Sequence, residues 1–361
     1  HWLMRHVNVC YNRYFTIEQA LKSYHISSTT ELCFANFNLA TPNSSSFIKA
    51  CDNDVWNHVL SNRILKYMEC KDILVDLIYI DNEEGLTQVK NAVPSLRKKI
   101  RDLTVKGVFN YFLPKFCKST GAFIIGTYMP KLLDIKLHFA LGQCPQFWQT
   151  PPLIPVSVDL KSREKFTISS DNYVGFEKFV RDLLPEMIPT CYLEGYVQLN
   201  RQIESLSWPS KPSFIFTSNN FDTDEIFKAW TGSKVEDGVP YFVAQHGNNY
   251  GTMQGILNMP ELTAVDNFFS WGWTNRNTKI IPAFVLKTYN LDLKTKDNGG
   301  LLLLTLHVPP LVSPLRAGDE YFEFGIYQDQ QFRFVAALPI EIQKELTVRL
   351  HDGWINSRWS D

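Results

Sequence analysis

Apolar residues at helical spacing dominate roughly the first 200 positions of the chain. Apolar and aromatic side chains recur three and four positions apart over residues 1–23 and again over residues 52–70. This spacing places them on one face of an α-helix, so each stretch predicts an amphipathic helix. Further helices are predicted over residues 94–113, 131–141, 175–184 and 193–206, a short strand over 122–126, and loops over 41–46, 144–155 and 208–212.

The pattern changes at residue 213 to short apolar runs that are separated by polar loops and helical stretches. Strands are predicted over residues 213–217, 241–244, 267–271, 301–306 and 346–350, and helices over 224–235 and between 326 and 337. Strands that alternate with helices predict a parallel sheet covered on both faces. A chain of 361 residues also suits two domains. We therefore expect an α/β protein with a helix-rich N-terminal lobe, residues 1–207, and an α/β lobe, residues 208–361.

Composition narrows the possible functions. The chain has 36 basic and 37 acidic residues and a net charge of -1, so it lacks the positive field that nucleic-acid binding needs. Its seven cysteines are odd in number and form no C-x-x-C pair, which argues against a disulfide framework or a zinc site. Free thiols fit a reducing cytoplasm. Aromatic residues make up 14% of the chain, and a large core explains them more simply than a stacking site does.

Membrane insertion is not expected from the sequence. No apolar run approaches the roughly 18 residues that span a bilayer, so we expect a cytoplasmic protein. The basic cluster at residues 97–101 favours a solvated helix face over a contact with anionic lipid or phosphate, although the second interpretation stays open.

The loop after the strand at residues 213–217 contains two aspartates. Asp222 lies three positions before Glu225, which resembles a capping box and gives Asp222 a structural interpretation. Asp224 is then less well explained. A carboxylate at the carboxyl end of a parallel strand points into the crevice where such sheets bind ligands. Asp224 is therefore a candidate nucleophile or general base, and Asp222 a second candidate.

The loop after the next strand contains His246 between amide and glycine residues. Gly247 and Gly251 allow the backbone to approach a ligand closely. His246 can donate to a phosphate, act as acid or base, or orient a carboxylate, and the alternative is a structural histidine. Neither a Walker loop nor G-x-G-x-x-G is present, so a dinucleotide is not indicated.

Three further sites have weaker support. Arg349 and His351 follow a predicted strand and could bind a phosphate or a carboxylate, but an ion pair with Asp352 explains them equally well. His307 ends another predicted strand. The Trp-Gly-Trp segment at residues 271–273 favours packing over a stacking wall.

Several of these segments together resemble one known family. They are FIFTSNNFDTDE at 214–225, GVP at 238–240, QHGNNYG at 245–251 and WGW at 271–273, with shorter matches at 128–130, 141–143, 331–334 and 348–350. They are similar to the retaining β-Kdo glycosyltransferase module of bacterial lipopolysaccharide O-antigen synthases and to related surface-polysaccharide transferases. Kdo is 3-deoxy-D-manno-oct-2-ulosonic acid. The resemblance covers most of the chain, and its block at residues 214–251 is specific.

The resemblance implies a GT-B-like architecture, in which two Rossmann-like lobes enclose a cleft. The donor would be CMP-Kdo and the acceptor the end of a lipid-linked O-antigen glycan, bound by the N-terminal lobe. Retention would proceed through a covalent adduct on Asp222 or Asp224, and the capping pattern favours Asp224. No metal or other cofactor is expected. The enzyme would lie in the cytoplasm or peripherally at the inner face of the bacterial inner membrane, and other transferase modules could share its polypeptide.

Residues of both strand-end loops and of the C-terminal strand are expected to bind the donor. They are Ser218, Asn219, Gln245, Gly247, Asn248, Asn249, Tyr250, Arg349 and His351. Two alternatives to a retaining Kdo transferase stay open. One is an inverting transferase that uses another nucleotide sugar with an aspartate as general base, and the other is a non-catalytic glycan-binding module.

Overall fold

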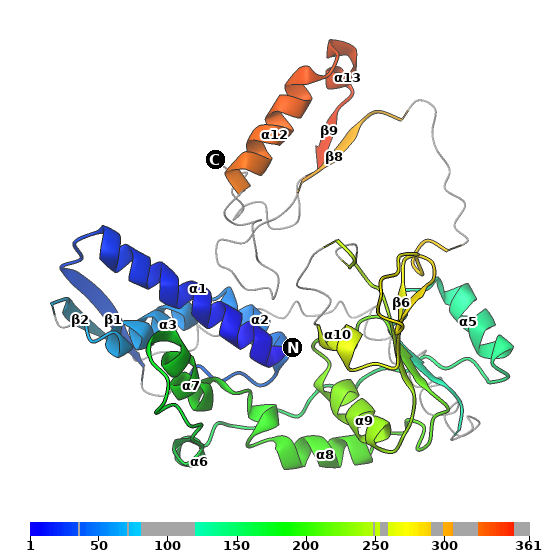
Figure 1. Cartoon of the computed structure of the whole chain (residues 1–361), viewed down its shortest axis with the longest axis horizontal. Coiled ribbons are helices and arrows are strands. Elements are labelled where there is room, and N and C mark those ends of the chain that lie inside the picture. Colours follow the sequence, from blue (N-terminus) through cyan, green and yellow to red (C-terminus); the bar gives the residue numbers. More distant parts are fainter. Residues whose placement is uncertain are drawn as a thin grey trace.

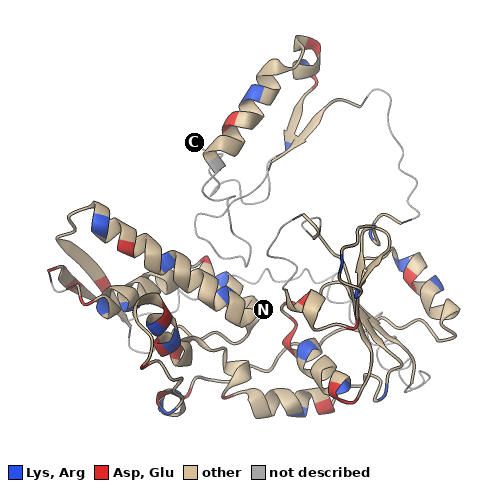
Figure 2. Ribbon diagram, in the orientation of Figure 1, with Lys and Arg blue, Asp and Glu red and all other residues tan. Residues whose placement is uncertain are grey.

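The computed structural model describes residues 1–34, 37–70, 72–80, 120–247, 250–252, 259–289, 299–305 and 324–349. It is a mixed α/β fold in which every described strand pair is parallel (Figure 1). The predicted helix at 94–113 with its basic cluster, and the candidates Asn248, Asn249, His307 and His351, lie outside the described residues. Acidic and basic side chains are interspersed over the fold (Figure 2), and the net charge of the chain is -1.

The N-terminal part is a group of helices around an apolar core. Its elements are α1 (Trp2–Ser23), α2 (Ser44–Cys51), α3 (Asp54–Tyr67), α6 (Leu160–Glu164) and α7 (Gly175–Met187), with strands β1 (Ser28–Phe34) and β2 (Leu74–Ile80). Val9, Phe47 and Leu60 are fully buried in this core. Burying a side chain of this size contributes about 1.5–3 kcal/mol.

Helix α2 corrects the predicted loop at residues 41–46. The side chain of Asn43 accepts a hydrogen bond from the Ser46 amide at 2.8 Å and so caps a helix that begins at Ser44. The polar residues at these positions are a helix start rather than a loop, because Asn satisfies an amide that has no partner within the helix. Strands β1 and β2 were not predicted. β1 begins with Ser-Thr-Thr-Glu, which hides the alternation of a strand.

His6 on α1 gives a first testable prediction. Its ring stacks on Trp2 at 5.1 Å, and burial lowers the pKa of His6 from 6.5 to about 4. Between those values the unfolded chain binds a proton that the folded chain does not, so stability is lost as pH falls from about 6.5 toward 4. The loss is roughly 3 kcal/mol.

We therefore expect His6→Gln to flatten the dependence of unfolding free energy on pH between 6.5 and 4, measured by urea titration. His25→Gln is the control because His25 is exposed. An unchanged slope in His6→Gln together with a flattened slope in His25→Gln would contradict this account.

The second part is a five-stranded parallel sheet in the order β3-β4-β5-β6-β7. Its strands are β3 (Phe123–Ile125), β4 (Ile215–Thr217), β5 (Tyr241–Ala244), β6 (Asn267–Ser270) and β7 (Ile280–Pro282). Helices α5 (Lys131–Ala140), α8 (Tyr196–Glu204), α9 (Glu225–Glu236) and α10 (Pro260–Thr263) and the 3-10 turn η2 (Thr190–Tyr192) accompany it. Phe123, Ile215, Phe227 and Phe268 are fully buried in its core. A parallel sheet accompanied by helices is consistent with a Rossmann-like fold, although the described strands follow one another in sequence order.

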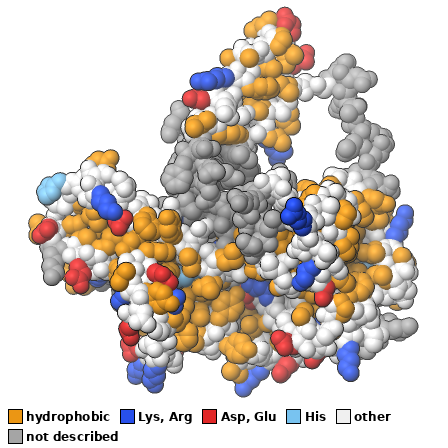
Figure 3. Space-filling view, viewed as in Figure 1, with side chains coloured by type: hydrophobic (Ala, Val, Ile, Leu, Met, Phe, Trp, Pro, Cys, Tyr) orange, Lys and Arg blue, Asp and Glu red, His pale blue; other side chains and the backbone are white. Residues whose placement is uncertain are grey.

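The predicted strands do not all join one sheet. β8 (Leu302–Leu304) and β9 (Thr347–Arg349) pair with each other, next to α12 (Phe324–Ala337) and α13 (Ile340–Lys344). β3, from before residue 208, supplies an edge of the main sheet instead. Leu304 and Phe332 of the C-terminal unit are 60% and 63% exposed, and Figure 3 shows hydrophobic side chains on its surface. The domain division at residue 208 and the GT-B arrangement stay predictions.

The helices that the structure describes include no candidate membrane span. None of them is both long enough and apolar enough to cross a bilayer.

Candidate active site at the carboxyl edge of the main sheet

The two loops that the sequence singled out lie side by side. β4 and β5 are adjacent and parallel, so their carboxyl ends share one edge of the sheet. Phe221, from the loop after β4, packs edge-on against the ring of His246, from the loop after β5, at 5.7 Å. His246 is half-buried and also contacts Tyr250, with 5.5 Å between ring centres. The predicted pair of strand-end loops is therefore present.

Asp224 is the N-cap of α9. One of its carboxylate oxygens accepts from the Phe227 amide at 2.9 Å. The other accepts from the side chains of Asn220 at 2.8 Å and Thr150 at 2.5 Å. The predicted capping box, with Asp222 as the cap, is wrong because the helix begins two residues later. Both Asp224 oxygens are occupied in holding the loop and the helix start.

Asp222 has different surroundings. Nη2 of Arg5 lies 2.8 Å from Oδ1 and 2.9 Å from Oδ2 of its carboxylate. Nζ of Lys228 donates to its backbone oxygen at 3.2 Å. The Asp222 side chain is 27% exposed, although its Oδ1 is buried, and its cationic partner comes from α1. Figure 1 shows the N-terminal end of α1 next to α10. Of the two aspartates, Asp222 is the one whose carboxylate is not used to cap a helix.

Glu225 joins the helical part to the sheet part. Its buried carboxylate accepts from the Ser44 amide at 3.0 Å and from the Tyr192 hydroxyl at 2.5 Å. Nζ of Lys228 lies 2.8 Å away. Burial and the neighbouring Glu225 carboxylate raise the pKa of Tyr192. The sequence suggested only a capping role for Glu225, because its partners lie far away along the chain.

The loop after β3 supports the loop after β4. Ser218 is fully buried, and its hydroxyl donates to the Thr127 carbonyl at 3.1 Å. The Asn219 amide donates to the Thr217 hydroxyl at 3.3 Å. Ser218, a predicted donor-binding residue, therefore ties two loops together, whereas Asn219 is half-buried at the same edge.

Gly126 shows how closely these loops approach. Its φ is +59°, and a Cβ built on it would lie 2.1 Å from Oδ1 of Asn220, the residue that donates to Asp224. Gly142 has a similar φ of +69° and no atom within 4 Å of such a Cβ. Gly142→Ala is thus a matched control that carries only the backbone strain, about 1–2 kcal/mol.

We expect Gly126→Ala to lower the free energy of unfolding by about 1–3 kcal/mol more than Gly142→Ala, because Asn220 has to move. Chemical denaturation of both variants and the wild type measures the difference. Equal losses in the two variants would show that the close approach of the loops is unimportant for stability.

Gln245 clamps the loop after β6. It is 3% exposed, and its Oε1 accepts from the Trp271 amide at 2.8 Å and from Nε1 of Trp273 at 2.7 Å. Its Nε2 donates to the Gly247 carbonyl at 2.6 Å. A Cβ on Gly251 would meet the Trp273 ring at 2.9 Å. The Trp-Gly-Trp segment is thus packed structure, as the sequence favoured, and Gln245 is fully engaged in holding it.

Tyr250 and Glu261 form a buried pair behind His246. The Tyr250 hydroxyl donates to Glu261 at 2.8 Å and lies 3.4 Å from Nδ1 of His246. The ring of His1 lies 3.3 Å from Glu261 and 3.8 Å from Asp222. Glu261 was not singled out from the sequence, and nothing in its local pattern marks it. These contacts connect the two loops through buried polar groups.

Arg349 is not brought to this edge. It is exposed on β9, in the separate two-stranded sheet, where its carbonyl accepts from the Thr305 amide at 3.1 Å.

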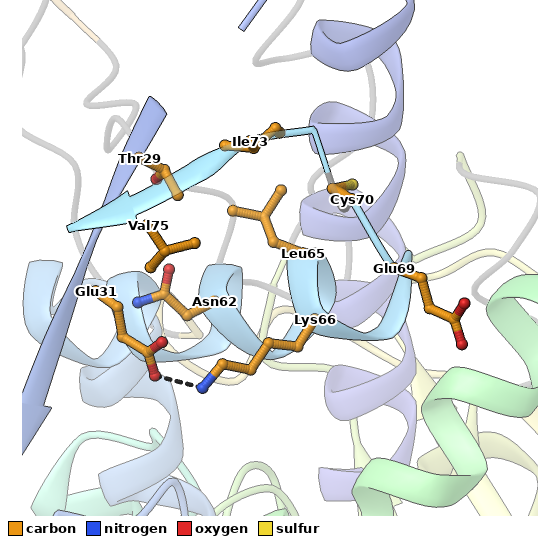
Figure 4. Close-up of a pocket in the computed structure, with 9 residues that line it drawn as sticks. All are labelled: Thr29, Glu31, Asn62, Leu65, Lys66, Glu69, Cys70, Ile73 and Val75. Atoms are coloured by element: carbon orange, nitrogen blue, oxygen red, sulfur yellow. Dashed lines mark hydrogen bonds and ion pairs between the residues drawn. The ribbon is translucent and has the colours of Figure 1, made fainter. Parts of the chain in front are cut away.

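Two cavities contain none of the predicted site residues. The first, about 230 Å³, is enclosed by β1, β2 and α3 (Figure 4). Its lining is mainly apolar, with a Glu31–Lys66 ion pair of 2.5 Å at its rim, and no predicted site residue contributes to it. The second, about 570 Å³, is lined by Trp148, Trp208 and Thr150 among others. Because Thr150 also donates to Asp224, this larger cavity reaches the start of α9.

Metal-binding clusters are not found in the described ranges. No group of three or more His, Cys, Asp or Glu side chains there could hold a metal ion. The six described cysteines are all unpaired. Burial raises the pKa of Cys51 to about 12 and that of Cys191 also to about 12, so neither thiol is activated.

Comparison with known proteins identifies a family. Residues 1–361, the whole chain, match the model of the LIC12162 family transferases. No curated protein and no solved structure matches the chain.

Proposed function

Since this chain belongs to the LIC12162 family of transferases, we propose that it is a glycosyltransferase that moves Kdo from CMP-Kdo to the end of an O-antigen glycan with retention of configuration. The membership supports transfer chemistry in general. The resemblance of residues 214–251 to β-Kdo transferases supports the donor and the acceptor. A lipid-linked acceptor would bring the enzyme to the inner face of the inner membrane.

The observation that supports the mechanism best is the accessible carboxylate of Asp222 at the carboxyl edge of the sheet. Transfer of a ketose passes through an oxocarbenium-like transition state, which a carboxylate beneath the anomeric carbon stabilises and can trap as an ester. Asp222 is partly exposed, and its pairing with Arg5 orients the carboxylate. Asp224, fixed as a helix cap, is assigned a structural role in this proposal.

The departing CMP carries a phosphate that needs hydrogen-bond donors. Lys228 lies beside Asp222, and His246 lies across Phe221 in the neighbouring loop. The Lys228 ammonium group or the His246 imidazole can stabilise the negative charge that develops on the phosphate as CMP leaves. The proposal assigns no step to a metal: Lys228 and His246 would offset the charge of the departing nucleoside monophosphate.

Donor specificity tests the proposal. The purified protein is incubated with CMP-Kdo, CMP-N-acetylneuraminate or UDP-glucose and an O-antigen acceptor, and nucleotide release is measured. We expect acceptor-dependent CMP release from CMP-Kdo only. Release from another nucleotide sugar, with none from CMP-Kdo, would overturn the proposed donor but leave the transferase class intact.

A further inference from the structure

Arg5 differs from the other buried arginines in the described part of the chain. Arg5, Arg13 and Arg163 are 7%, 5% and 4% exposed. The nitrogens of Arg13 donate to Asn57, Asn12 and the Cys51 carbonyl. Arg163 donates from Nε and Nη2 to Glu194 and from Nη1 to backbone carbonyls. Both guanidinium groups are therefore satisfied by the protein.

Arg5 uses only one of its three nitrogens. Nη2 donates to Oδ2 of Asp222 and lies at ion-pair distance from Oδ1, whereas Nε and Nη1 are buried and have no hydrogen-bond partner among the described residues. A buried donor without a partner costs about 1–3 kcal/mol, and more when it is charged. A buried donor without a partner needs an explanation, and a bound ion or ligand that supplies the acceptor is one such explanation.

The surroundings of Arg5 favour an anionic ligand. Its guanidinium lies at the start of α1, a helix of 22 residues whose first amides add positive potential. Lys228, which donates to the Asp222 carbonyl and forms an ion pair with Glu225, is a second cation nearby. The Nε–H and Nη1–H bonds point to opposite edges of the planar guanidinium, so each can donate to an anionic acceptor on its own side.

We propose that Arg5 binds an anionic group of the donor substrate through Nε or Nη1 while Nη2 orients Asp222. This inference rests on the proposed function, since the donor offers two such groups, the phosphate of CMP and the carboxylate of Kdo. One residue then aligns the donor with the carboxylate that attacks it. Arg5 was not a candidate in the sequence, because its role depends on a partner 217 positions away.

Binding measurements separate the two anionic groups. Titration calorimetry compares CMP with cytidine, and Kdo with its methyl ester, on wild type, Arg5→Lys and the control Arg163→Lys. Lysine keeps the charge beside Asp222 but lacks the planar fork. We expect Arg5→Lys to weaken either CMP or Kdo binding about 10- to 100-fold, with the uncharged analogue of that ligand unaffected. Arg163→Lys should leave the preference for CMP over cytidine and the preference for Kdo over its methyl ester unchanged.

Cytidine affinity also reports whether Arg5→Lys is folded. If that variant loses cytidine binding, the double variant Arg5→Met with Asp222→Asn replaces it, since removing both members of a buried pair is tolerated better than removing one. Wild-type preferences for CMP over cytidine and for Kdo over its ester, both kept in the folded variant, would overturn the role of Arg5. A wild type that binds neither CMP nor Kdo would instead remove the proposed function.

Discussion

Asp222→Ala is expected to lower the rate of Kdo transfer at least about 1,000-fold, as removal of an attacking group does in other enzymes. Asp222 has the accessible carboxylate at the carboxyl edge of the sheet, and no helix depends on it for a cap. Steady-state CMP release measures the effect. Thermal unfolding should show a folded protein, although Arg5 loses its partner.

Asp224→Ala is the matched comparison two residues away. Its loss removes the cap of α9 and leaves Asn220 and Thr150 without their acceptor. We expect the free energy of unfolding to fall by about 2–3 kcal/mol, while the folded fraction keeps most of its activity. Loss of turnover in Asp224→Ala with full turnover in Asp222→Ala would reverse our assignment of the two residues.

Glu225→Leu is expected to destabilise the protein by about 3–5 kcal/mol, because it leaves Lys228 and two buried donors without their acceptor. The Ser44 amide, at the start of α2 in the helical part, and the Tyr192 hydroxyl, on η2, are those donors. The loss should therefore weaken the attachment of the helices to the sheet. Chemical denaturation followed by far-ultraviolet circular dichroism measures the effect.

Glu177→Leu is the control for Glu225→Leu. Glu177 forms an exposed ion pair with Arg181 at 3.5 Å, and such pairs contribute about 0–1 kcal/mol. A Glu225→Leu variant as stable as Glu177→Leu would mean that the buried network does not hold the two parts together.

The sequence predicted the elements of the main sheet well, since each strand is a short apolar run between turn residues. β4, β5 and β6 lie within the predicted ranges 213–217, 241–244 and 267–271. Which strands pair was not predictable in the same way. β3 joins β4 across about 90 positions, and β8 and β9 pair only with each other among the described strands. Pairing depends on packing between distant segments, which local pattern does not record.

The candidate site was predicted as two loops but not as a set of contacts. Asp222 and Asp224 both lie just before Glu225 and the apolar start of α9. Local spacing alone therefore did not decide which of the two caps the helix. The contacts that distinguish the two aspartates come from distant residues. Thr150, 74 positions away, donates to Asp224, and Arg5, 217 positions away, donates to Asp222. Gln245 illustrates the same limit, because its place beside His246 suggested ligand binding and its contacts show a clamp on Trp271 and Trp273.

Intact-protein mass spectrometry after incubation with CMP-Kdo tests the central claim most directly. Wild type, Asp222→Ala and Asp224→Ala are compared without acceptor, so that an adduct is not consumed. A mass increase of one Kdo residue in wild type and Asp224→Ala, absent in Asp222→Ala, is the predicted result. An adduct that persists in Asp222→Ala and disappears in Asp224→Ala, or acceptor-dependent CMP release with no adduct on any protein, would contradict the assignment of Asp222 as the nucleophile.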